Sequence, residues 1–416
     1  MKLKGAVSVS VDELRAGVTC SHAIEDDHGV LLLGANTPIT QQLIDGLKDR
    51  GIDSIEIDPR DLAAMRGKKK KKPAPKKERK EETGWNSSKP LKNFLVDRHD
   101  EDLCEERSEL LTQKMDAART EFAELKEMMS YERIRSLGEL MFVSDDYARS
   151  IVDDHDQTLG AILRLGLTCD PDERSIWMAV LGMAVATEMG LDAQQSIEVG
   201  ITGLIHDIGL HAMDSKFRKP IEMMTESEVW EYRKHPLVSV LCISEVTEIP
   251  QSVRMAMQQV HEQFDGSGFP RGIKGQRIHQ YARILNVVDA YLQLTVPNTE
   301  RRGVVPHDAL GMMLHQASRG FFDPKVIRAL LNVESLFPLG SLVELKSGEL
   351  AQVIRRPRNG FAAPVLQDLD GKRIELENTK VEVVRPVCDP SVDQMRLTPQ
   401  VMQSTLWHPA SHTLPT

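Results

Sequence analysis

The chain has 416 residues, of which 41% are hydrophobic and 27% charged, so its length predicts two or three domains with sizeable cores. Its formal net charge of −10 argues against general nucleic-acid binding. The first residues lack the apolar core of a secretory signal, and no stretch has the length of a membrane span, which together predict a cytoplasmic protein.

The sequence of residues 1–65 predicts a small α+β module. Alternating apolar residues predict a strand over residues 7–11, and a second strand and a turn over residues 29–40. A short helix is predicted over residues 41–51, followed by a strand over residues 54–58. The module has no cluster of His, Asp or Cys, so a sensory, docking or purely packing role fits it better than chemistry.

A basic linker and a long helical region follow. The run GKKKKKPAPKKERKEE predicts a disordered linker over residues 66–98. Apolar residues spaced by three, four, five and seven positions predict an amphipathic helix over residues 100–138, which could form a homodimer contact. His155 has three acidic neighbours and is predicted to lie on a solvated face, whereas Pro171 begins an apolar helix that should be central to a bundle.

Residues 200–290 are the candidate functional region, because His and Asp residues stand there in apolar surroundings. The pair His206–Asp207 ends an apolar helical run, and Asp289 lies inside another, so each is costly to bury without a partner. A hydrogen-bonded core His beside a capping Asp is the alternative explanation for the pair alone. His235 and His261 add two more imidazoles, and together these side chains predict a site for one or two divalent metals.

Immediately after His261, a glycine-rich turn runs from Asp265 to Pro270. Gly266 and Gly268 permit backbone conformations that other residues avoid, so bare amides of this turn could approach a phosphate closely. Further along the chain, residues 337–386 alternate apolar and polar positions around two turns, which predicts a small antiparallel sheet. Residues 387–416 are rich in Pro, Ser, Thr and Gln and predict a flexible tail.

The order of these motifs resembles the HD-GYP family, bacterial phosphodiesterases that hydrolyse the second messenger cyclic di-GMP. The resemblance rests on His206–Asp207, on the HP step at His235, on VHEQFDGSGFP over residues 260–270, and on Asp289. It extends over about residues 100–385. It implies a mainly α fold, with an HD-type helical bundle over residues 99–336 between the small N-terminal module and the C-terminal β segment.

The sequence departs from the family pattern at four positions. Arg174 stands where the family has a His that opens a core helix, and Val260 replaces the first His of the paired HH. Leu210 replaces a common Lys, and Phe269 replaces the Tyr of GYP. Two metal ligands and one cation that faces phosphate are therefore missing.

The resemblance implies two metal positions, filled by iron or manganese rather than zinc. His206, Asp207 and Asp289 would hold one ion, and His235, His261 and a bridging Asp207 would hold the second. Each position would keep three protein ligands, as open catalytic sites do. The catalytic pair would be His206 and Asp207.

The residues expected to meet substrate phosphate are Gly266, Gly268, Phe269, Pro270, Arg271 and Arg174. Arg174 cannot coordinate a metal, and its charge would repel a nearby cation, so a phosphate contact is the expected role. Three functions remain open: a metal-dependent cyclic di-GMP phosphodiesterase, an inactive descendant that binds a nucleotide or a protein partner, and a hydrolase of another phosphate ester.

Overall fold

A computed structural model describes residues 7–11, 14, 19–20, 24–25, 31–33, 37–50, 52, 54–57, 89–131, 138–164, 171–298, 301–404 and 407. The chain divides into two compact units, residues 1–84 and residues 85–416. The basic run of the predicted linker lies outside the described residues. Among the helices in the described part of the chain, none has the length and apolar character needed to cross a bilayer.

The first unit is a small α+β module, as predicted. Its main sheet has the strand order β1-β6-β3-β4, and α1 supplies the helix. The Thr40 hydroxyl accepts from the Leu43 amide and so caps the start of α1. The elements are β1 Val7–Ser10, β2 Thr19–Cys20, β3 Ile24–Glu25, β4 Leu31–Leu33, β5 Thr37–Pro38, α1 Gln41–Asp49 and β6 Ser54–Ile57.

The second unit is mainly helical, which confirms the predicted fold class. Its helices are η2 Leu91–Phe94, α3 Glu105–Tyr131, α4 Gly138–Asp153, α5 His155–Arg164, α6 Pro171–Glu188, α7 Ala193–Ile205, α8 Gly209–Ala212, η3 Ser215–Arg218, η4 Ile221–Met223, α9 Glu226–Tyr232, α10 His235–Cys242, α11 Gln251–Gln259, η5 Gly275–Arg277, α12 Gln280–Thr295, α13 Pro306–Ser318, α14 Pro324–Glu334, η6 Leu376–Asn378 and α15 Pro399–Ser404. Its strands are β7 Gly303–Val304, β8 Leu342–Leu345, β9 Leu350–Arg355, β10 Val365–Asp368, β11 Arg373–Glu375, β12 Val383–Val387 and β13 Gln394–Met395.

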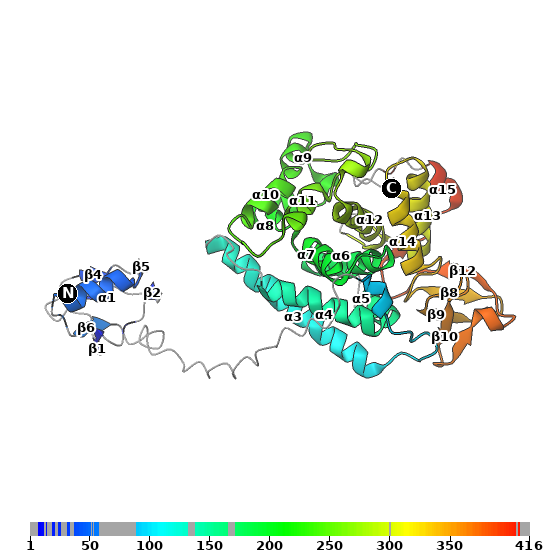
Figure 1. The fold of residues 1–416 in the computed structure, drawn as a ribbon, viewed down its shortest axis with the longest axis horizontal. Helices are drawn as coiled ribbons and strands as arrows, with labels where there is room; N and C mark the ends of the chain where they lie inside the picture. Colours follow the sequence, from blue (N-terminus) through cyan, green and yellow to red (C-terminus); the bar gives the residue numbers. More distant parts are fainter. Residues whose placement is uncertain are drawn as a thin grey trace. The chain divides into compact units, whose positions relative to one another are not determined.

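Helices α6, α7 and α12 form the centre of this unit (Figure 1). They are apolar on almost every side, as expected for helices that are surrounded by others. At Gly203 of α7, a Cβ would lie 2.8 Å from the Ala179 amide of α6, so this glycine lets the two backbones approach closely. The ends of these helices carry the polar residues of the site.

Helix α3 packs its apolar face against the body of its own unit. Met115, Ala118, Phe122 and Leu125 are buried in the same core as α4 and α6. The amphipathic helix predicted over residues 100–138 is therefore present from Glu105 to Tyr131. Its apolar stripe is used within the chain, and the homodimer through this helix stays a prediction.

A five-stranded antiparallel sheet with the order β11-β10-β9-β8-β12 follows the helices, as predicted for residues 337–386. Buried ion pairs hold it to α5 and the residue before it. Arg355 contacts the Asp154 carboxylate with both side chains almost fully buried, and Arg356 Nε lies 2.6 Å from Asp156 Oδ1. Such paired charges are strongly destabilising to break.

Two of the predicted boundaries are wrong. Residues 89–96, expected in the linker, pack against the helical body: Leu91 is fully buried and its amide donates to the Leu191 carbonyl oxygen at 2.8 Å. The predicted flexible tail instead forms β13 and α15, and the Leu397 amide donates to Asp308 at 2.8 Å.

The prediction for His155 is also wrong. Its side chain is buried instead of lying on a solvated face, and His155 Nδ1 lies 3.2 Å from Asp156 Oδ1. The cause is Arg356, the residue after β9, which contacts Asp156 although the two are 200 residues apart in the sequence.

Candidate metal centre

The site begins where α7 ends. His206 is the C-terminal cap of this helix, and Asp207 follows it. Two residues later, Gly209 meets the start of α10 so closely that a Cβ there would lie 2.6 Å from the His235 carbonyl oxygen. The absence of a side chain at Gly209 therefore allows His235 to approach the pair.

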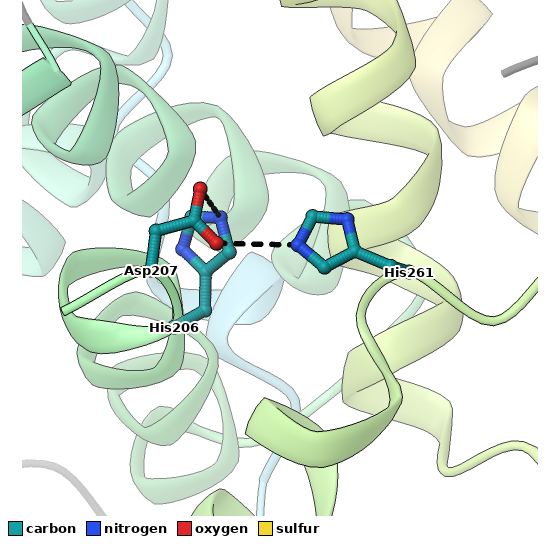
Figure 2. Close-up of side chains that lie close together, drawn as sticks. All are labelled: His206, Asp207 and His261. Atoms are coloured by element: carbon teal, nitrogen blue, oxygen red, sulfur yellow. Dashed lines mark hydrogen bonds and ion pairs between the residues drawn. The ribbon is translucent and has the colours of Figure 1, made fainter. Parts of the chain in front are cut away.

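Three imidazoles surround the Asp207 carboxylate. His235 Nε2 lies 3.1 Å and His261 Nε2 3.2 Å from Asp207 Oδ1, and His206 Nε2 lies 3.2 Å from Asp207 Oδ2. Figure 2 shows His206 and Asp207 leaving one helix end while His261 points toward them from another segment. The ligand atoms of His206, Asp207 and His261 all lie within 4.8 Å of one another, which is compact enough to hold one metal ion.

Backbone carbonyls orient two of these rings. His206 Nδ1 lies 2.9 Å from the Gly203 oxygen, and His235 Nδ1 lies 2.8 Å from the Tyr232 oxygen. Because a carbonyl oxygen only accepts, each Nδ1 carries a proton and each Nε2 is left for another partner. Both Nε2 atoms are buried and lack a hydrogen bond of good geometry among the described residues. A divalent ion is the partner that such nitrogens fit.

Ionisation prepares the site for a cation. Burial would raise the pKa of Asp207, but the charge of His206 and the close approach of the imidazoles hold it well below its ordinary value. Burial lowers the pKa of His235. Burial also acts to lower the pKa of His206, yet the Asp207 carboxylate raises it overall. The ionised Asp207 and a neutral His235 are the forms that bind metal, and an ion would displace any second proton on His206.

Asp289 lies beside this cluster but has a different partner. The Arg174 guanidinium contacts Asp289 Oδ1, and Gln293 Nε2 donates to Asp289 Oδ2 at 2.8 Å. His261 Nδ1 lies 3.7 Å from Asp289 Oδ2. Burial acts to raise the pKa of Asp289, but the Arg174 charge lowers it overall. Arg174 thus forms an ion pair within the protein, and its contact with phosphate stays a prediction.

The glycine-rich turn supports His261. A Cβ at Gly268 would overlap the Gln263 amide nitrogen and the His261 carbonyl oxygen, so only glycine fits there. The Phe269 ring is buried and stacks on the His261 ring with centroids 5.0 Å apart and an interplanar angle of 12°. Phe269 is therefore a wall of the site that fixes the imidazole.

Most amides of this turn are engaged inside the protein. The Gly266 amide donates to Gln263, the Ser267 amide to Asp265, the Phe269 amide to His261 and the Arg271 amide to Glu262. Three amides of the turn that was expected to approach phosphate, those of Gly266, Ser267 and Phe269, are thus already in use. The Arg271 side chain is exposed.

The structure adds residues that the sequence did not indicate. Tyr232 orients His235 through its carbonyl oxygen, Gly203 does the same for His206, and Gln293 holds Asp289. Gln293 lies one helical turn after Asp289, a spacing that could have pointed to it. The backbone carbonyls leave no mark in the sequence.

Comparison with known proteins agrees with this geometry. Residues 149–326 match the HD domain family. The chain is 28% identical over 190 residues to cyclic di-GMP phosphodiesterase PA4108 of Pseudomonas aeruginosa, which covers 46% of this chain and 45% of that protein. It is 31% identical over 156 residues to 3'3'-cGAMP-specific phosphodiesterase 1 of Vibrio cholerae, covering 37% and 36%. The chain thus spans less than half the length of these relatives.

Among solved structures, the chain matches Bd1817, a HDG"Y"P protein from Bdellovibrio bacteriovorus. It has a TM-score of 0.45 and 16% sequence identity, and the match covers 78% of this chain and 98% of that chain.

Residues 149–326 match the HD domain, a metal-dependent class, and the His206, Asp207 and His261 group within them can hold an ion. With its DGSGFP turn and its HP step, this domain is similar to those of the HD-GYP family.

Proposed function

We propose that the helical domain is a metal-dependent phosphodiesterase that hydrolyses a cyclic dinucleotide, with cyclic di-GMP as the first candidate. The observation that carries the proposal is the convergence of three imidazoles on Asp207, two of them with buried Nε2 atoms that lack hydrogen bonds among the described residues. A bound divalent ion supplies a water of lowered pKa and offsets charge on a phosphoryl oxygen. No side-chain nucleophile is then required.

The residues of this chain hold and orient such an ion. His206, Asp207, His235 and His261 are the proposed ligands, and the carbonyl oxygens behind two of the rings fix their tautomers. Iron or manganese is the proposed metal, because a mixed nitrogen and oxygen donor set without thiolates suits either ion.

Relatives support the substrate class. Several matched proteins are cyclic di-GMP phosphodiesterases, and others are specific for 3'3'-cGAMP. Both substrates are cyclic dinucleotides, so the shared chemistry is cleavage of a phosphodiester bond. The cytoplasmic location and the absence of a nucleic-acid partner stay predictions.

A second candidate function is a receptor that binds the nucleotide without turnover. The ion pair between Arg174 and Asp289 favours it, because Asp289 is neutralised without a metal. The receptor would use the same site and would differ from the enzyme in releasing unchanged nucleotide.

One experiment separates the two functions. Purified protein is assayed for bound metal and for hydrolysis of cyclic di-GMP and 3'3'-cGAMP, with iron or manganese added. Asp207→Ala removes the carboxylate that all three imidazoles face, so metal content should be lost and turnover should fall more than about 100-fold. His315→Ala, which removes a histidine on α13, serves as the matched control.

Turnover that disappears in Asp207→Ala but persists in the control supports the enzyme. Nucleotide binding by the metal-loaded wild type without any product supports the receptor. A wild-type protein that binds neither metal nor nucleotide refutes both.

A further inference from the structure

We infer that Arg174 takes the place of a second metal ion, so that this site binds one divalent ion beside Asp207 and keeps a permanent guanidinium charge beside Asp289. The inference rests on the proposed metal-dependent function. It goes further by fixing the number of ions and naming the residue that sets it.

Arg174 lies where a cation would be needed. It is in the first turn of α6, and its Nη2 contacts Asp289 Oδ1 and lies 3.4 Å from the Asp289 backbone oxygen. The Asp289 side chain is only 6% exposed, so the contact is shielded from solvent. A charge-assisted hydrogen bond in such surroundings is strong, and an ion at Asp289 would have to displace it.

Asp289 has little capacity left for a metal. One carboxylate oxygen is held by Arg174, and the other accepts from Gln293 Nε2 at 2.8 Å. Asp207 is different, because its neighbours are imidazoles, two of which present buried nitrogens that lack hydrogen bonds within the described residues. The surroundings of Asp289 therefore suit the Arg174 guanidinium, whereas those of Asp207 suit a metal ion.

Val260, the second position without the expected imidazole, lies on the Asp289 side of the site. Its side chain is fully buried in the apolar core, and its carbonyl oxygen accepts from Asn286 Nδ2 at 2.9 Å. Asn286 lies on α12, one turn before Asp289. Both positions where the chain lacks an expected imidazole thus lie against α12, and the ligands around Asp207 are untouched.

The charges favour a single ion. Asp207 and Asp289 are the two carboxylates of the site, and the Arg174 charge already balances one of them. One divalent ion leaves a single net positive charge, which a hydroxide or a substrate phosphate can neutralise. A second divalent ion would leave three positive charges in a largely buried site, which is strongly unfavourable.

The guanidinium also has access to substrate. The Arg174 side chain is 28% exposed, so it is not sealed behind Asp289. An arginine can bind carboxylate and phosphate through different N–H groups of its planar fork. Arg174 would then offset charge on a phosphoryl oxygen, as an ion at this position would.

The test is a count of bound ions. Wild type, Arg174→His and Arg328→His are dialysed to equilibrium with excess Mn²⁺, and bound manganese per chain is measured together with its electron paramagnetic resonance spectrum. Arg328 is exposed on α14, so its variant controls for the loss of an arginine and the gain of an imidazole. We expect one ion with an uncoupled spectrum in the wild type and the control, and two coupled ions in Arg174→His.

Two ions in the wild type overturn the inference and leave the proposed hydrolase intact. An Arg174→His protein that still binds one ion also overturns it, because the guanidinium would then not be what excludes the second. No bound ion in the wild type refutes the proposed function itself. Should the variant fail to fold, the count in the wild type alone still decides between one ion and two.

Discussion

Glu334 is a buried carboxyl group whose proton stabilises the fold. It is the last residue of α14 and is fully buried, with the Tyr291 hydroxyl as a polar neighbour of its carboxyl group. Burial raises the pKa of Glu334 to about 8, against an opposing effect of the Arg356 charge. At neutral pH this side chain is therefore mainly protonated in the folded protein.

The sign of the pH dependence follows from the two pKa values. The unfolded chain releases this proton near pH 4.5 and the folded chain near pH 8, so between them the folded state holds one more proton. The free energy of unfolding then falls by about 1.4 kcal/mol per pH unit as pH rises. The stabilisation is complete below the unfolded pKa and is lost by the folded pKa, a total on the order of 5 kcal/mol.

Glu334→Gln removes the ionisation and keeps the shape. The difference in free energy of unfolding, variant minus wild type, should rise with pH between 5.5 and about 8 and then level off. Only the wild type loses stability in this range, because only its side chain must become a buried charge. Urea unfolding followed by tryptophan fluorescence measures this, since all four tryptophans belong to the second unit. Glu377→Gln, at an exposed position, is the control. A difference between Glu334→Gln and wild type that stays constant across this range would refute the reasoning.

Two further substitutions test the support of the site and the corrected C-terminal boundary. Gly268→Ala should lower metal content measured by elemental analysis, because the added Cβ overlaps the His261 carbonyl oxygen, whereas Ser267→Ala in the same turn should not. Unchanged metal in Gly268→Ala would show that the turn does not position His261. Leu397→Ala should lower the free energy of urea unfolding by about 2–5 kcal/mol, as expected for a buried leucine, while Leu369→Ala, which is 78% exposed, should have little effect. Equal effects of these two would mean that residues after 387 are a flexible tail after all.

The order of motifs made the centre of the site predictable. His206, Asp207, His235 and His261 stand in separate segments, and each is a polar side chain at the edge of an apolar run, which is costly without a partner. The structure gathers them around one carboxylate. What the sequence could not provide is the partner of Asp289, because Arg174 precedes it by 115 residues and no local pattern joins them.

The errors in the fold have the same origin. His155 has acidic neighbours in sequence, which favours a solvated face, but Arg355 and Arg356 of β9 and the residue after it turn that region into a buried ion-pair cluster. The C-terminal residues have the composition of a tail, yet Arg396 pairs with buried Asp308 on α13. Local composition describes a segment by itself, and distant charges decide whether it is buried.

The contrast between Asp207 and Asp289 is the reason to expect one metal ion at this site and not two. A buried carboxylate needs a positive partner, and Asp289 has one in Arg174 that no chelator removes. Among the described residues, the ion-pair partners of Asp207 are imidazoles, whose charge depends on pH, and two of them present buried nitrogens without hydrogen bonds. Metal removal should therefore disturb the end of α7 around Asp207 and leave the contact between α6 and α12 in place. Amide hydrogen exchange, measured with and without manganese, tests this. If added manganese slows exchange equally at the end of α7 and at the contact between α6 and α12, the two carboxylates share their metal.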